Sequence, residues 1–145
     1  MSLSLWMLLA FAGWTLLVLL IGVGVYRWAL IFAGRAALTS FPGDTPHGSA
    51  AYRRAVRAHA NCIENLPVFG AIVLIAAVAH LGSPTIDRLA VATVVARVAQ
   101  TSIHLLWPES NAMVACRFSF FLLQVLTMIA MGALVVAAAI TGAGH

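Results

Sequence analysis

Four long apolar stretches constrain the fold of this chain more than any other feature. They run from about residues 3 to 26, 62 to 81, 89 to 107 and 118 to 140. Each approaches or reaches the roughly 20 residues that an α-helix needs to cross a bilayer core. Because a backbone in lipid must satisfy its own hydrogen bonds, the stretches predict an all-α integral membrane four-helix bundle. We expect a single domain, residues 1–145.

The composition agrees with a membrane protein. Hydrophobic residues make up 63% of the chain and charged residues 8%, with a mean hydropathy of +1.02, whereas a soluble domain carries about 25% charged residues. The arginines are dispersed among apolar runs, which argues against a nucleic-acid partner. Cys62 and Cys116 belong to no Cys/His cluster, so we predict no metal site. The first stretch has no basic residues before it and no clear cleavage site, so we expect a span rather than a signal peptide.

The placement of the arginines predicts the orientation of the chain. Five of the eight lie in or beside the long first connection, about residues 27–58: Arg27, Arg35, Arg53, Arg54 and Arg57. By the positive-inside rule this loop is cytoplasmic and the N-terminus is not. Turn residues predict a loop at residues 40–48. Residues 49–60 resume a helical composition, and we expect them to join the second span as one long helix.

Polar side chains inside the spans mark a candidate site, because such residues are costly in a membrane and usually functional. In the second helix they recur at i, i+4 and i+7, with His59 nearby: Arg57, Asn61 and Glu64. In the third helix they recur at i, i+3, i+4 and i+7: Arg97, Gln100, Thr101 and His104. In the fourth helix they share one face: Arg117 and Gln124. Pro67 is expected to kink the second helix and free a backbone carbonyl near Glu64.

Each of these residues also has a purely structural interpretation. Glu64 and Arg97 would then form a buried ion pair, Gln124 an interhelical hydrogen bond, and Arg117 would reach the headgroups. Taken together, the arginines and amides favour a site for an anionic, polar ligand that enters from the cytoplasmic half of the bundle. No reaction follows from these residues alone.

Residues 57–69 resemble the second-helix signature of the MAPEG family, membrane-associated proteins in eicosanoid and glutathione metabolism. The shared pattern is R-A-H-x-N-x-x-E-x-x-P-x-F. Residues 97–104 resemble the third-helix segment of the family, and Arg117 matches a further family arginine. The resemblance spans nearly the whole chain and points to a bacterial-type member similar to microsomal glutathione transferases, in a bacterial inner membrane.

The resemblance implies a homotrimer that binds glutathione as cosubstrate between subunits, near the cytoplasmic side. It implies conjugation of glutathione to lipophilic electrophiles, or reduction of lipid hydroperoxides, taken from the bilayer. Arg117 would be the catalytic residue beside the thiol, since a guanidinium favours the nucleophilic thiolate. Glu64 would hold the glutathione α-amino group. The remaining glutathione-binding residues would be Arg57, Asn61, Arg97, His59, Gln100, His104 and Arg35.

Two departures from the family pattern leave a second function open. His104 stands where family enzymes commonly have a tyrosine, and Ala60 stands where they often have an arginine. These changes motivate a non-catalytic membrane protein of the same fold that binds a lipid or a partner protein. A small multidrug-type transporter is a third candidate, but that class is expected to have an acidic residue in its first helix, and residues 3–25 carry no charge.

Overall fold

The computed structural model describes residues 1–41 and 47–142, which form helices and no strand. In chain order the elements are α1 (Leu3–Leu17), the π-helical η1 (Val18–Gly24), α2 (Val25–Phe32), the 3₁₀ turn η2 (Leu38–Ser40), α3 (Ala50–Val78), α4 (Pro84–Leu106) and α5 (Asn111–Thr141). Within the described residues, four helical stretches are long and apolar enough to cross a membrane, with α1, η1 and α2 forming one of them, Leu3–Phe32. The predicted all-α, four-helix membrane architecture is therefore confirmed.

The helices differ in their bounds from the apolar stretches that predict them: each begins earlier or ends later at one end, while α3 ends at Val78, before residue 81. The first helical stretch continues to Phe32 rather than Tyr26, and α5 begins at Asn111 rather than near Phe118. The expected fusion of residues 49–60 with the second span is also confirmed, because α3 is one helix from Ala50 to Val78. That helix continues through Pro67. Residues 42–46 of the predicted loop lie outside the described residues.

Serine side chains explain where the long helices begin. The hydroxyl of the residue before each of α1, α3, α4 and α5 accepts a hydrogen bond from a backbone N–H in the first turn: Ser2, Ser49, Ser83 and Ser110. Such a cap satisfies a donor that has no partner within the helix. Pro84, the first residue of α4, suits that position because it lacks an N–H.

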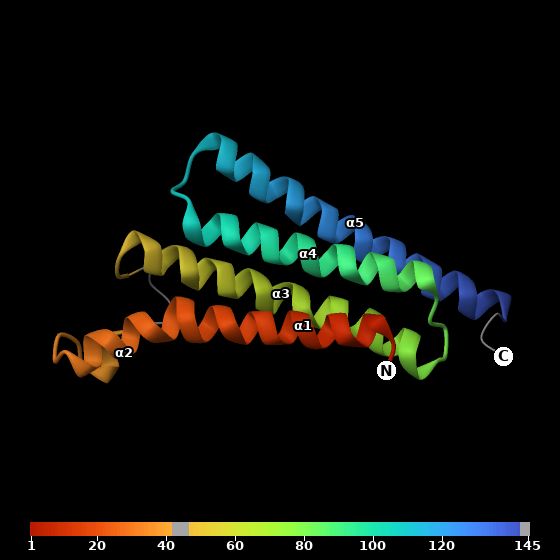
Figure 1. The fold of residues 1–145 in the computed structure, drawn as a ribbon, viewed down its shortest axis with the longest axis horizontal. Helices are drawn as coiled ribbons and strands as arrows, with labels where there is room; N and C mark the ends of the chain where they lie inside the picture. Colours follow the sequence, from red (N-terminus) through yellow and green to blue (C-terminus); the bar gives the residue numbers. More distant parts are fainter. Residues whose placement is uncertain (42–46, 143–145) are drawn as a thin grey trace.

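The helices form an antiparallel bundle in which α4 contacts α1, α3 and α5 (Figure 1). The starts of α1 and α4 meet at one end, where the Ser4 backbone N–H donates to Asp87 Oδ1 at 2.8 Å. The first connection and the α4–α5 connection lie at the opposite end (Figure 1). Large buried apolar side chains fill the centre, among them Phe11, Phe69, Val73, Ile86 and Met131. The bundle thus places the arginine-rich first connection and the start of α5 at the same end (Figure 1).

Aromatic contacts hold the first connection against α3. The rings of Tyr26 and Tyr52 stack with centroids 4.4 Å apart, and Arg27 Nε donates to the Tyr52 hydroxyl at 2.6 Å. Gly48 lies against both rings with φ +77°, in the left-handed region. A Cβ at Gly48 would lie 2.7 Å from Tyr52 Cδ1. Only glycine fits this close approach without displacing the tyrosines.

We predict that Gly48→Ala destabilises the protein more than Gly34→Ala. Gly34 has a similar φ of +66°, but a Cβ added at Gly34 would have no described atom within 4 Å. Gly34→Ala is therefore expected to lower the unfolding free energy by about 1–2 kcal/mol, the backbone penalty alone. Gly48→Ala is expected to lose a further ~1–3 kcal/mol through steric overlap. Unfolding in mixed detergent micelles measures both, and equal losses would contradict the tyrosine contact.

Candidate functional site

Four of the predicted site residues lie around one pocket, near the end of the bundle at which α4 connects to α5. The pocket has a volume of about 270 Å³ and lies between α3, α4 and α5. Asn61 contributes from α3, Gln100 and His104 from α4, and Arg117 from α5. These residues are far apart in the sequence, and the antiparallel packing of three helices brings them together.

The apolar wall of the pocket comes from α5, at a spacing that places its residues on one helical face. Val114, Phe118 and Phe121 recur at i, i+4 and i+7 and line the pocket beside Arg117. Phe118 is 61% exposed, so this wall continues to the outer surface of the bundle. The pocket therefore combines one cation and polar side chains with an aromatic wall that continues to the outer surface.

The polar side chains of α4 form a buried stripe, as their spacing predicts. Arg97, Gln100, Thr101 and His104 are all buried. His104 lines the pocket, and its Nε2 is buried without a hydrogen-bond partner among the described residues. Thr101 Oγ1 lies 3.8 Å from the Cys62 thiol of α3. The stripe thus faces the interior of the bundle, and its end nearest the α4–α5 connection opens into the pocket.

Gln124 joins α5 to this stripe. It is fully buried, and its Nε2 donates to Gln100 Oε1 at 2.9 Å. One turn further along α5, the Thr127 hydroxyl lies 2.8 Å from the Thr93 hydroxyl of α4. The structural interpretation of Gln124 as an interhelical hydrogen bond is therefore confirmed.

Arg97 lies deeper than the pocket and does not line it. The side chain is 1% exposed, and its Cζ is 5.4 Å from the centre of the Phe11 ring of α1. Its Nε and Nη2 make no hydrogen bond to any described residue. Glu64 is exposed on the outer face of α3, and the two residues form no ion pair within the described part of the chain. The alternative of a buried Glu64–Arg97 pair is thus not observed.

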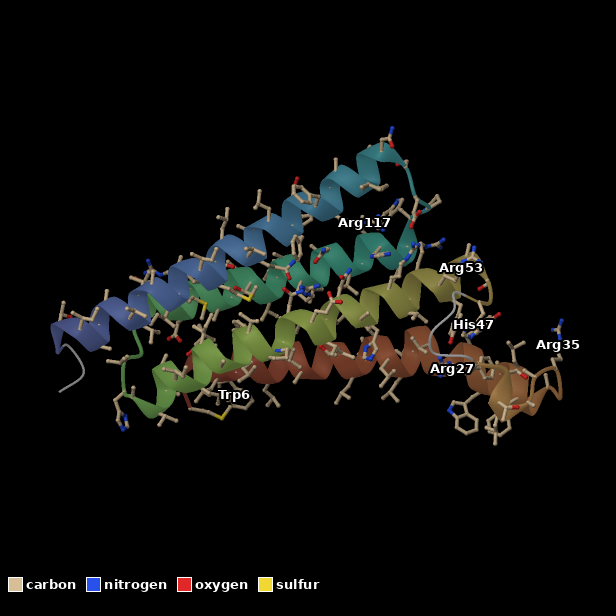
Figure 2. All side chains as sticks on the ribbon, turned by 180° about the vertical axis from the view of Figure 1, so that it is seen from behind. Trp6, Arg27, Arg35, His47, Arg53 and Arg117 are labelled. Carbon is tan, nitrogen blue, oxygen red and sulfur yellow. The ribbon has the colours of Figure 1, made fainter. Side chains whose placement is uncertain are left out.

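The other predicted residues occupy different positions around this end. Arg57 lies one turn before Asn61 on α3, is exposed, and pairs with Glu109 in the α4–α5 connection. His59 is partly buried on α3, with its Nδ1 unpartnered among the described residues. Arg35 lies just beyond α2, at the tip of the molecule and well apart from Arg117 (Figure 2).

Sequence reasoning missed two parts of this arrangement. The i, i+4, i+7 spacing of Val114, Phe118 and Phe121 was available in the sequence, but an apolar stripe in an apolar span carries no distinguishing signal. Glu109, in the connection between α4 and α5, was not among the predicted site residues. Its contact with Arg57 joins residues 52 positions apart, which no local pattern indicates.

Comparison with known proteins gives one result. The model of the MAPEG family matches residues 4–137. Comparison with curated proteins and with solved structures finds no significant match to the chain. The family match includes most or all of each of the four membrane-spanning helices and every pocket-lining residue.

We predict that the Gln100–Gln124 hydrogen bond stabilises the packing of α4 on α5. Removing it with Gln124→Leu is expected to lower the unfolding free energy by about 0.6–1.7 kcal/mol, the usual range for such bonds in membranes. Gln100→Leu is the partner variant, and the double variant completes a thermodynamic cycle measured in mixed detergent micelles. Purely additive losses would show that the two amides do not interact.

Proposed function

The chain belongs to the MAPEG family, and on that premise we propose that it is a glutathione-dependent transferase or peroxidase. Its substrates are lipophilic electrophiles or lipid hydroperoxides that enter from the bilayer. The family includes enzymes of both activities. The single observation that carries the proposal is the pocket in which Arg117 lies beside the aromatic wall of Phe118 and Phe121.

The proposed role of Arg117 is to hold glutathione as its thiolate. A guanidinium beside the sulfur favours the charged form over the thiol, and the thiolate is the reactive nucleophile. In conjugation, the sulfur forms a bond to the electrophilic carbon and the leaving group departs with the bonding electrons. In peroxide reduction, the sulfur attacks the terminal peroxide oxygen, the O–O bond breaks, and the released alkoxide takes up a proton. The glutathione sulfenic acid that forms then reacts with a second glutathione, which gives the disulfide and water. The aromatic wall would position the lipophilic substrate beside the sulfur.

The remaining predicted residues would bind the polar parts of glutathione. Asn61, Gln100 and His104 line the pocket and offer amide and imidazole groups. Arg57, at the mouth, would take a glutathione carboxylate, because arginine pairs well with carboxylates. His59, Arg97 and Arg35 do not line the pocket of the single chain, so their role in glutathione binding stays a prediction from the family resemblance.

The outward position of Glu64 supports a site shared between subunits. Its side chain lies exposed on α3 with Ile63 and Val68, both more than half exposed. A carboxylate on a surface that faces lipid is costly and needs a partner. A second copy of the chain would cover this surface in the proposed homotrimer, and Glu64 would then receive the glutathione α-amino group. We place the pocket on the cytoplasmic side of a bacterial inner membrane, following the arginines of the first connection.

A second candidate function is non-catalytic binding of a lipid or a partner protein. Two observations favour it: His104 and Ala60 replace residues common in the family enzymes, and the exposed Phe118 offers an apolar docking surface. This candidate expects ligand in the pocket but no turnover of any electrophile.

We predict that Arg117→Ala abolishes most thiolate formation. At neutral pH the thiolate fraction of bound glutathione, followed by ultraviolet absorbance, is expected to fall by roughly tenfold or more, because the neighbouring cation is lost. Conjugation of a lipophilic electrophile should fall with it. Arg88→Ala is the matched control, since Arg88 is exposed near the start of α4, at the opposite end of the bundle.

Two results would count against this proposal. If the native protein binds no glutathione at millimolar concentration, the glutathione-dependent function is wrong. If it binds glutathione but converts no electrophile or hydroperoxide, the non-catalytic candidate is favoured.

We predict that the purified protein is a trimer in mild detergent. Native mass spectrometry or light scattering corrected for bound detergent should give three copies of the 15.3 kDa chain. Glu64→Leu is expected to weaken glutathione binding without unfolding the monomer, because Glu64 is exposed. A dimer as the largest stable species would contradict the shared-site arrangement.

A further inference from the structure

Arg57, the proposed carboxylate-binding residue at the pocket mouth, already has a carboxylate partner. Its Nη2 lies 2.5 Å from Glu109 Oε1, the one ion pair formed among the described residues. Both side chains are accessible, with exposed fractions of 57% and 48%. The pair connects α3 to the short connection between α4 and α5.

The pair lies close to the pocket. Arg57 is one helical turn before Asn61, a pocket-lining residue, so the two share a face of α3. Glu109 lies in the connection that follows His104 and α4 by a few residues. The ion pair therefore lies beside the pocket, on the side of the α4–α5 connection, and contributes no lining residue itself.

The charges around this mouth are unequal. Arg117 lines the pocket, and Arg54 and Arg57 lie on the turns of α3 just before Asn61, whereas Glu109 contributes one carboxylate. An anionic ligand entering this region is attracted by the arginines and repelled by Glu109. Glu109 is also chemically equivalent to a ligand carboxylate, since both offer Arg57 the same pair of oxygen acceptors.

We propose that Glu109 is an internal competitor that sets the affinity and the charge specificity of the pocket, occupying Arg57 until a ligand carboxylate displaces it. This inference rests on the proposed function, in which glutathione supplies that carboxylate. Only a ligand with a negative charge of its own replaces the interaction that Glu109 gives up. Small uncharged thiols cannot displace Glu109 from Arg57, and they bind poorly.

Displacement of Glu109 from Arg57 also affects α5, the helix that carries Arg117. Glu109 belongs to the connection that leads into α5, and α5 diverges from α4 at this end (Figure 1). The ion pair tethers the start of α5 to α3 while the pocket is empty. When a ligand takes Arg57, this tether is released, and the first turns of α5 are held by the ligand instead.

The test is glutathione binding to the full-length protein in detergent, measured by calorimetry for Glu109→Gln. We expect the Kd to fall by about two- to fivefold, the size of an exposed ion pair's contribution, because Arg57 no longer has to be released. Glu109→Asp keeps the charge but is one methylene shorter, and it should give an intermediate Kd. Asp87→Asn is the matched control: it makes the same carboxylate-to-amide change at the opposite end of α4, and its Kd should stay at the native value.

Two further measurements isolate the mechanism. Arg57→Gln should weaken binding, and adding Glu109→Gln to it should bring a smaller gain than Glu109→Gln brings in the native protein, because only the direct repulsion of the ligand by Glu109 is then removed. Glutathione diethyl ester, whose carboxylates are neutralised, should bind the native protein and Glu109→Gln equally. The melting temperature of each unliganded variant shows that it is folded.

The outcomes separate this inference from the proposed function. If the native protein binds glutathione and Glu109→Gln leaves the Kd unchanged or raises it, Glu109 is not a competitor and this inference is wrong while the proposed function stands. If neither the native protein nor any variant binds glutathione, the proposed function fails and this inference fails with it.

Discussion

The hydrogen bond between Gln124 and Gln100 fixes the part of the bundle on which the pocket depends. In a bilayer interior no water is available to satisfy an amide, so its partners must come from the protein. Gln124 Nε2 donates to Gln100 Oε1 and to the Phe120 carbonyl of its own helix. The Gln124–Gln100 bond and the neighbouring Thr93–Thr127 contact hold α5 against α4. Gln100 also lines the pocket, so the contact that joins the helices is part of the pocket wall.

The pocket is open because the polar contacts between α4 and α5 do not continue to the start of α5. On the far side of Gln124, towards the start of α5, the two helices diverge (Figure 1). Arg117 and Phe118 lie on this diverging segment and border the pocket. At the end of the segment, the Arg57–Glu109 pair connects α3 to the α4–α5 connection. The helices are therefore joined by polar contacts on both sides of the pocket, while its aromatic wall stays open to the surroundings.

The candidate site could be predicted from the sequence where polar residues recur at helical spacing. The i, i+3, i+4, i+7 spacing in α4 correctly predicted a single face, and Arg97, Gln100 and His104 are all buried. The spacing in α3 was less informative, because the same stripe contains the pocket-lining Asn61 and the exposed residues Arg57 and Glu64. A stripe identifies neighbours on one helix but not the direction in which that face points. Glu109 contacts Arg57, and Phe11 contacts Arg97. Both partners lie on other segments of the chain, so the local spacing of residues does not predict these contacts.

The sequence by itself determined the four membrane helices, because their length and apolarity leave a chain in lipid no other way to satisfy its backbone. It also determined which family the residues resemble, since the second-helix pattern is carried by residues 57–69 alone. Only the tertiary structure decided that Arg97 turns into the bundle towards Phe11, that Glu64 faces outward, and that Glu109 occupies Arg57. The reason is physical: the rotation of each helix about its axis is set by packing against the other helices, and that packing involves residues far apart in the chain.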